Sequence, residues 1–172
     1  MDLLVRDAGP DDAEAIVGIL NPIIEAGVYT AFDTTFTVEA EREYILKFPQ
    51  CGVFHVAVLT QGERKIVGFQ SMEPFATYTH AFDHVGILGT YVELSYRRQG
   101  ISKCLFRATF EAARRKGYEK ILTFVRGDNK AALATYLNQG FRIVGTALRQ
   151  AKLNGKYVDE LIVERFLDES YQ

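Results

Sequence analysis

An apolar segment that runs into a basic, glycine-containing turn and then into a helix is the feature that most restricts the fold of this chain. Residues 85–94 read as a strand, residues 97–100 spell RRQG, and residues 102–116 have the apolar spacing of a helix. The first turn of a helix offers unpaired N–H groups and a positive dipole end, which bind phosphate well. Gly100 lets the backbone approach a ligand closely, and the two arginines add positive charge. The same turn also fits a solvated loop when it is taken alone, so its context decides between the two.

The rest of the chain alternates between strand and helix patterns. Short apolar runs predict strands, and apolar residues spaced three or four apart predict helices. The expected strands cover residues 3–5, 53–59, 65–72, 85–94, 121–125, 141–144 and 157–166, and the expected helices cover about 11–27, 38–48, 102–116 and 129–140. This order predicts a mixed α/β fold. The length of 172 residues suits a single domain over 1–172.

Composition excludes several classes of protein. The formal net charge of −2 argues against a dedicated nucleic-acid binder, which usually carries a basic domain charge. No apolar run approaches the length of a membrane span, and the N-terminus lacks the pattern of a signal peptide. Cys51 and Cys104 form no C-x-x-C pair and have no histidine cluster nearby, so no metal site is expected. We therefore expect a cytoplasmic protein without nucleic-acid or membrane partners.

A second informative element lies one strand further along the chain. Residues 129–141 read NKAALATYLNQGF, which predicts a short helix capped at Asp128 or Asn129 and ending at Gly140. Tyr136 lies near the end of that helix. A core aromatic on an amphipathic helix would explain the tyrosine equally simply when it is considered alone.

The two elements together resemble the GNAT superfamily of N-acetyltransferases. The R/Q-x-x-G-x-G/A signature that follows the fourth strand of that family is present over residues 97–102, with Ser102 in place of the final Gly or Ala. The later pattern N-x-x-A-x-x-x-Y-x-x-x-G-F matches from Asn129 to Phe141. The resemblance implies a single-domain GNAT fold, with a mixed, mostly antiparallel sheet, a splayed central strand pair and about four helices.

The resemblance also implies acetyl-CoA as co-substrate and assigns residues to it. Val92 and Leu94 would expose backbone groups to the pantetheine arm, and the amides of residues 99–103 would hold the pyrophosphate. The expected cofactor-binding residues are Val92, Leu94, Arg97, Arg98, Gln99, Gly100, Ile101, Ser102, Lys103 and Asn129. Tyr136 would protonate the departing thiolate as a general acid, which is a role that a positioned tyrosine can fill.

The general base is less constrained by the sequence. An ammonium group must lose a proton before it attacks, and a carboxylate, a histidine or a water chain could accept that proton. Glu73 and His84 are the first candidates for this catalytic role, because they stand at the end of one expected strand and the start of the next. The other candidates near the expected mouth of the site are His80, Asp83 and Glu93.

A second resemblance concerns the loop that is expected to line the pocket for the acceptor amine. Residues 30–43 look similar to the loop that lines the acceptor pocket in the phosphinothricin and methionine-sulfoximine acetyltransferase branch, whose members act on small amino-acid-like amines. The expected substrate-binding residues are Phe32, Phe36, Phe75 and Tyr78, although the same aromatics could simply cover the sheet. That branch carries an acidic residue early in its fourth strand, whereas residues 86–89 here read GILG. The branch also tends to form homodimers, so a homodimer is consistent with the resemblance.

Three functions remain open from the sequence. The favoured one is direct acetyl transfer to the primary amine of a small molecule, such as an amino acid or an analogue. The alternatives are a peptide or protein N-terminal acetyltransferase and a non-catalytic acyl-CoA-binding regulator. A dinucleotide-binding domain is disfavoured because no G-x-G-x-x-G follows the first strand, and a P-loop is absent as well.

Overall fold

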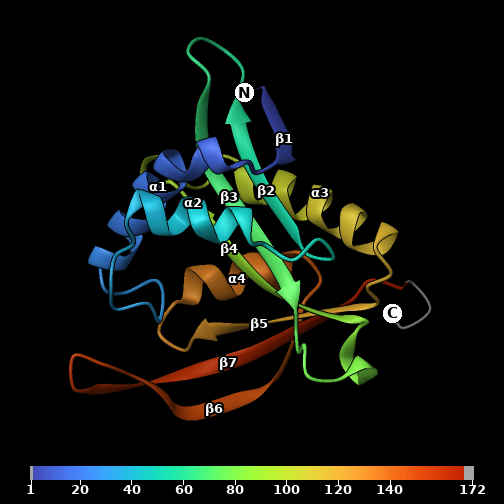
Figure 1. Ribbon diagram of the computed structural model, residues 1–172. Helices are drawn as coiled ribbons and strands as arrows, with labels where there is room; N and C mark the ends of the chain where they lie inside the picture. The colour runs from blue at the N-terminus through green and yellow to red at the C-terminus, as the bar shows by residue number, and fades with distance from the viewer. Residues whose placement is uncertain (1, 169–172) are drawn as a thin grey trace.

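The strands of the computed structural model join in one twisted sheet (Figure 1), whose order is β1-β2-β3-β4-β5-β7-β6. The structure describes residues 2–168, so Met1 and residues 169–172 of the predicted domain lie outside the described residues. The strands are β1 (Leu3–Asp7), β2 (Val53–Leu59), β3 (Lys65–Pro74), β4 (Val85–Val92), β5 (Lys120–Arg126), β6 (Arg142–Leu153) and β7 (Lys156–Phe166). All neighbouring pairs in the sheet are antiparallel except β4 with β5.

Helices cover both faces of the sheet (Figure 1). The four α-helices found within residues 2–168 are α1 (Ala13–Glu25), α2 (Val38–Leu46), α3 (Ile101–Arg115) and α4 (Lys130–Asn138). Helices α1 and α2 pack on one face and α3 and α4 on the other, each pair with its own apolar core. None of the helices in this range is both long enough and apolar enough to span a membrane.

The predicted order of strands and helices is confirmed, and the differences lie at the ends of elements. Helix α1 follows a short 3-10 turn at Pro10–Asp12 and continues through Pro22 to its last turn. The two final strands form a longer hairpin than the sequence indicates, because β6 runs on to Leu153 with irregular register. The mixed, mostly antiparallel sheet is therefore the predicted one, with its last hairpin extended.

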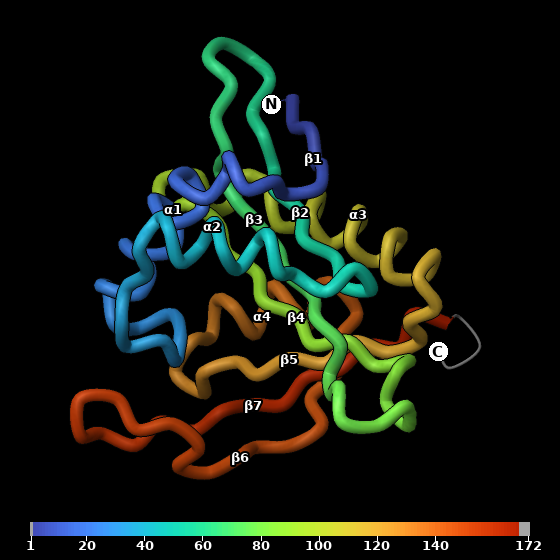
Figure 2. Tube along the Cα trace, in the orientation of Figure 1, coloured from blue at the N-terminus to red at the C-terminus, as the bar shows by residue number. Residues whose placement is uncertain are grey.

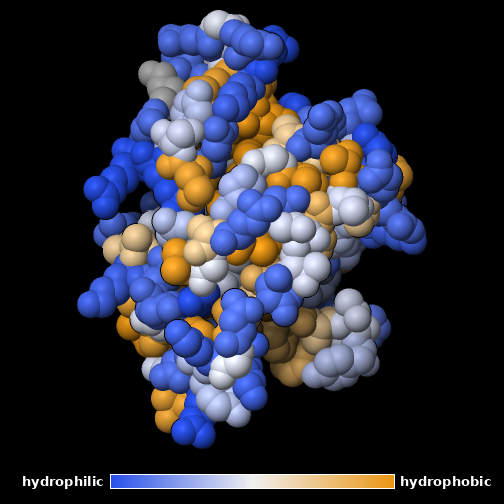
Figure 3. All heavy atoms as spheres, turned by 90° about the vertical axis from the view of Figure 1, so that its left-hand side faces the viewer, coloured by the Kyte–Doolittle hydropathy of each residue, from blue (hydrophilic) through white to orange (hydrophobic). Residues whose placement is uncertain are grey.

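The pairing of β4 with β5 is short. Only Val85–Ile87 of β4 pairs with Lys120–Leu122 of β5, and beyond these residues the two strands diverge. Figure 2 shows the same divergence along the Cα trace. Figure 3 shows the surface on the left-hand side of Figure 1, where hydrophilic and hydrophobic residues are intermixed. The predicted splay of the central strand pair is confirmed. The rest of β4 has no strand partner on its β5 side.

An aromatic cluster holds α4 against this gap. The ring of Tyr136 lies 5.4 Å from that of Phe106 on α3 and 5.1 Å from that of Phe141, both with edge-to-face geometry. All three side chains are buried, and each buried aromatic contributes about 1.5–3 kcal/mol through the hydrophobic effect. The packing fixes the helix that carries Tyr136 beside the point where β4 and β5 separate.

Candidate active site

Two cavities meet at the gap between β4 and β5. We call them the helix-side cavity, of about 500 Å³ and lined largely by residues 90–102 and 129–136, and the loop-side cavity, of about 400 Å³ and lined largely by residues 29–32, 87–91, 123–126 and Glu160. The residues that line both are Tyr29, Thr90, Tyr91, Ala132 and Tyr136. An elongated ligand that enters one cavity and reaches the other must therefore pass the Tyr136 side chain.

The helix-side cavity ends at the start of α3. Gly100 has φ of +82°, a left-handed conformation that a side chain would strain. Among residues 2–168, no side chain hydrogen-bonds to the first turn of α3, and that turn contains no acidic residue. The Arg97 guanidinium lies 4.0 Å from the ring centre of Tyr29, which directs its charge to the cavity that both residues line. Free N–H groups and arginines at one helix start form a site for a phosphate.

Most of the predicted cofactor residues lie around this cavity. Those that line it are Val92, Arg97, Arg98, Gly100, Ile101, Ser102 and Asn129, whereas Leu94, Gln99 and Lys103 are exposed beside it and do not line it. The amide oxygen of Asn129 caps α4 by accepting from the Ala132 N–H at 3.1 Å, and its amide nitrogen donates to the Tyr29 carbonyl at 3.1 Å. Asn129 thus joins the start of α4 to the 26–37 loop, whose Tyr29 lines both cavities.

Tyr136 belongs to a buried hydrogen-bond chain. Its hydroxyl donates to Oγ1 of Thr90 at 3.1 Å, and Nε2 of Gln70 donates to the same oxygen at 2.8 Å. Gln70 is 0% exposed, and its amide oxygen has no partner among the described residues. Burial raises the pKa of Tyr136, while hydrogen bonds with Thr90 and Thr123 act in the opposite direction. The phenol therefore keeps its proton at neutral pH and holds it where the two cavities join.

A buried arginine shapes the loop-side cavity. Arg126, which is 7% exposed, donates to the carbonyl oxygens of Gly27 at 2.9 Å and Thr30 at 3.0 Å. Its Nε and Nη2 atoms donate to the two oxygens of the Asp128 carboxylate, at 2.9 and 2.7 Å. Because charge-assisted and bidentate hydrogen bonds are strong, this side chain clamps the 26–37 loop onto β5. The clamp sets the position of the cavity wall.

The predicted acceptor residues divide into two groups. Phe32 lines the loop-side cavity, where its ring lies 6.5 Å from that of Tyr91, and Phe36 packs edge-to-face behind it at 5.4 Å. Phe75 and Tyr78 lie elsewhere and pack against Phe82 in the 75–84 loop. The structure therefore brings Phe32 to the loop-side cavity with Phe36 behind it, whereas Phe36, Phe75 and Tyr78 line neither cavity.

The predicted bases also lie away from the gap. Glu73, near the end of β3, hydrogen-bonds with Tyr44 of α2. His84 is exposed at the start of β4, where its carbonyl accepts the N–H groups of residues 119 and 120 at the paired end of the two strands. Neither residue lines the helix-side or the loop-side cavity.

Several residues at the junction escaped the sequence analysis. Thr90 and Arg126 read as ordinary strand residues, and Glu160 reads as one of several charges on the final strand. Glu160 is half-buried and lines the loop-side cavity, and burial raises its pKa. A period-of-two count along β5 and β7 could have placed Arg126 and Glu160 on one face of the sheet, because the two are paired in register.

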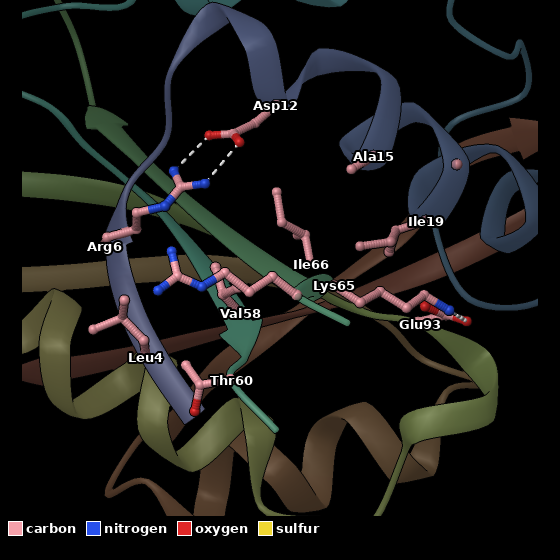
Figure 4. A pocket seen from close by; sticks show the side chains of 12 residues that line it. Leu4, Arg6, Asp12, Ala15, Ile19, Val58, Thr60, Lys65, Ile66 and Glu93 are labelled. Carbon is pink, nitrogen blue, oxygen red and sulfur yellow. Dashed lines mark hydrogen bonds and ion pairs between the residues drawn. The ribbon is translucent and has the colours of Figure 1, made fainter. Parts of the chain in front are cut away.

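A separate hollow of about 520 Å³ lies between α1 and the outer ends of β1, β2 and β3 (Figure 4). Its charged side chains are largely paired with one another. Arg6 donates to both carboxylate oxygens of Asp12 at 2.7 and 2.8 Å, and Lys65 donates to Glu93 at 2.9 Å. Among the described residues that line this hollow, Arg64 is the one charged residue outside these two pairs. In the part of the chain that the structure describes, no group of three His, Cys, Asp or Glu side chains gathers as metal ligands would.

Known proteins resemble this chain over nearly all of its length. Phosphinothricin N-acetyltransferase of Streptomyces coelicolor is 25% identical over 95% of this chain and 96% of its own. The L-methionine sulfoximine/L-methionine sulfone acetyltransferase of Pseudomonas aeruginosa is 24% identical over 98% of this chain and 96% of its own. A crystal structure of a phosphinothricin acetyltransferase from Sinorhizobium meliloti in complex with acetyl-CoA superposes with a TM-score of 0.88, at 20% identity, over 98% and 90% of the two chains. The last likeness establishes the shared fold.

A family match agrees with the geometry. The acetyltransferase (GNAT) family matches residues 25–141, which include the basic turn before α3, the splayed strands and α4. That range exceeds half of the chain. The chain therefore belongs to the acetyltransferase (GNAT) family and is an acetyl-CoA-dependent N-acetyltransferase.

Proposed function

We propose that this enzyme transfers the acetyl group of acetyl-CoA directly to the primary amine of a small molecule, an amino acid or an analogue of one, with Tyr136 as general acid. The observation that carries the proposal is the buried Tyr136 side chain, which lines both cavities beside the splayed strands. A direct transfer needs two substrates that enter separately and meet at one point, and this arrangement supports such a meeting.

The helix-side cavity fits acetyl-CoA. The uncapped start of α3, with Arg97 and Arg98 beside it, suits the pyrophosphate. The pantetheine arm would then follow β4 past Val92, where the strand has no β5 partner and its backbone groups are open to a ligand. Among the predicted cofactor residues, Leu94, Gln99 and Lys103 would contribute from the rim, and Asn129 would act beside the arm or through the 26–37 loop.

The chemistry follows from the junction. The thioester would lie between the two cavities, where a backbone N–H of β4 stabilises the charge that develops on the carbonyl oxygen. The sulfur that leaves needs a proton, and Tyr136 holds one there because its raised pKa keeps the phenol protonated. Thr90 orients that hydroxyl through the hydrogen bond of 3.1 Å.

The loop-side cavity would hold the acceptor. Its volume of about 400 Å³ and its aromatic wall, built from Phe32 and Tyr91 with Phe36 behind, suit a small molecule better than an extended peptide. The names of the two relatives from Streptomyces and Pseudomonas point to amino-acid-like amines. The aromatic residues outside the cavity, Phe75 and Tyr78, would contribute only if the 75–84 loop approached it. The homodimer and the cytoplasmic location both stay predictions.

Thiol release from acetyl-CoA, measured against a panel of amines, tests the proposal. The panel holds amino acids, methionine sulfoximine, phosphinothricin, polyamines, aminoglycosides and short peptides. Release that depends on amino-acid-like amines is the expected result, and Tyr136→Phe should then lower kcat by about 10²–10⁴-fold while acetyl-CoA still binds. Release with peptides alone would favour an N-terminal acetyltransferase. If no amine of the panel causes thiol release although acetyl-CoA binds, the result would favour the non-catalytic regulator.

A further inference from the structure

Glu160 lines the loop-side cavity, and its carboxylate has no part in the acetyl transfer described above. Glu160 lies on β7, opposite Arg126 of β5 on one side and Ala147 of β6 on the other. Paired residues of neighbouring strands project to the same face of a sheet, so Glu160 and Arg126 share a face. Both line the loop-side cavity, and Glu160 is the sole carboxylate among the described residues that line it.

This carboxylate is also unpaired. Within residues 2–168, the side chain of Glu160 makes no hydrogen bond and no ion pair, because the guanidinium of Arg126 is turned to Asp128 and to the carbonyls of the 26–37 loop. Withdrawing an ionised carboxylate from water without a partner is unfavourable. Burial accordingly raises the pKa of Glu160, while the charge of Arg126 acts to lower it. A cationic ligand in the cavity would supply the missing partner.

We infer that Glu160 binds the ammonium group of the acceptor in the loop-side cavity and takes the proton that this group loses before it attacks. The inference rests on the acetyl transfer proposed above. Glu73 and His84 line neither cavity, so either could receive that proton only through intervening groups. Glu160 reaches the cavity directly.

The reaction balances with this assignment. One N–H proton of the ammonium passes to the Glu160 carboxylate, and the freed lone pair forms the N–C bond to the acetyl carbon. The C–S bond breaks, its electron pair stays on sulfur, and the Tyr136 hydroxyl supplies the proton of the thiol. The second proton that the nitrogen loses on forming the amide restores that hydroxyl, and Glu160 releases its own proton to solvent.

The groups around Glu160 define how its titration would respond. Arg126 from β5, Tyr29 from the 26–37 loop, Tyr91 from β4 and Tyr136 from α4 are the charged or titratable residues that line the cavity with it. Of these, Arg126 favours the ionised carboxylate. Burial raises the pKa values of Tyr91 and Tyr136, so these two phenols stay neutral at the pH at which a carboxylate titrates.

The test is the pH dependence of kcat/KM for the preferred amine of the panel, at saturating acetyl-CoA, for the wild type, Glu160→Gln, Glu160→Asp and Asp159→Asn. Asp159 is the matched control, because it is the adjacent carboxylate on β7 and accepts the backbone N–H of Arg149 outside both cavities. The affinity for acetyl-CoA is measured in parallel by calorimetry. Glu160→Asp guards against a fold defect, since it keeps the charge.

The expected result is a loss in kcat/KM of about 10²-fold or more for Glu160→Gln at neutral pH, with unchanged affinity for acetyl-CoA. Its rate should then climb steadily with pH, because only acceptor molecules that have already lost the proton react. Glu160→Asp should retain part of the activity, and Asp159→Asn should match the wild type. A Glu160→Gln enzyme with wild-type kcat/KM and pH profile overturns this inference alone, whereas a wild type that acetylates no amine overturns the proposed function as well.

Discussion

Replacing Thr90 with valine tests whether the buried hydrogen-bond chain positions Tyr136. The substitution keeps the shape of the side chain and removes the oxygen that accepts from both Tyr136 and Gln70. Valine cannot replace that acceptor, so two buried donors lose their partner. We expect Thr90→Val to lower kcat by about 10²-fold, since a displaced reacting group can cost that much, and to leave the affinity for acetyl-CoA unchanged.

The cost in stability follows from the same two bonds. Leaving a buried donor unpaired costs about 1–3 kcal/mol, so the loss for Thr90→Val should be roughly 2–4 kcal/mol if the Tyr136 hydroxyl partly recovers by turning to Thr123. In a chain of this size each kcal/mol shifts Tm by about 2–4 °C, which gives a fall of roughly 4–16 °C. The variant stays folded at assay temperature if its wild-type Tm lies in the usual mesophilic range.

A second buried threonine separates lost stability from lost catalysis. Thr109 of α3 is fully buried, and its hydroxyl lies 3.0 Å from Nδ1 of His55, outside both cavities. Thr109→Val should lower Tm but leave kcat intact, and Thr90→Ser should restore most of the turnover that Thr90→Val loses. Thermal unfolding and thiol release on the same preparations make the comparison. Equal kcat in Thr90→Val and the wild type would refute the positioning role.

Three further variants test the rest of the site and the sheet. Arg126→Met removes the hydrogen bonds of a buried guanidinium to the Gly27 and Thr30 carbonyls and should raise the KM for the acceptor by freeing the 26–37 loop; an unchanged KM would contradict the clamp. Gly100→Val strains a residue at φ of +82° by about 1–2 kcal/mol and should weaken the binding of acetyl-CoA, which calorimetry measures. An unaltered affinity would contradict the proposal that this turn binds the pyrophosphate. Burial acts to raise the pKa of Glu164, but hydrogen bonds from Lys120 and Arg142 outweigh it and lower the pKa. This contribution to stability is present above the unfolded pKa and lost as pH falls through the folded one, so Tm should drop below about pH 4.5 and drop less in Glu164→Gln.

The fold was largely predictable because its signals are local. Apolar periodicity marks each strand and helix, and the turn over 97–100 and the capped helix that starts after Asn129 identify the family. The ends of elements were less predictable. The helix expected over about 11–27 ends at Glu25 in the structure. It continues through Pro22, because its apolar residues are buried against β3 and β4 and this packing outweighs the lost hydrogen bond.

The site was predictable only where a motif marks it. The residues of the 97–102 turn and of α4 follow the spacing of known family motifs, and most of the cofactor residues predicted from these motifs line the helix-side cavity. Glu160 and Arg126 stand 34 positions apart in sequence and meet only through the register of β5 with β7. Glu73 and His84 were chosen because strand ends often form the mouths of sites. In this sheet the two cavities lie instead near the C-terminal ends of β4 and β5, where these two strands separate.

The place of the chemistry is set by the short pairing between β4 and β5. If the ladder continued past Ile87, the backbone of β4 would be satisfied by β5, and the two cavities would be walled off from each other. Because the pairing stops there, side chains from α4 and from β7 can both reach the space beside β4. Tyr136 reaches it from α4, and Glu160 reaches the loop-side cavity from β7. In the proposed transfer the departing sulfur takes its proton from Tyr136 and the acceptor amine gives its own to Glu160, so the chemistry requires both side chains to reach the same opening from different elements.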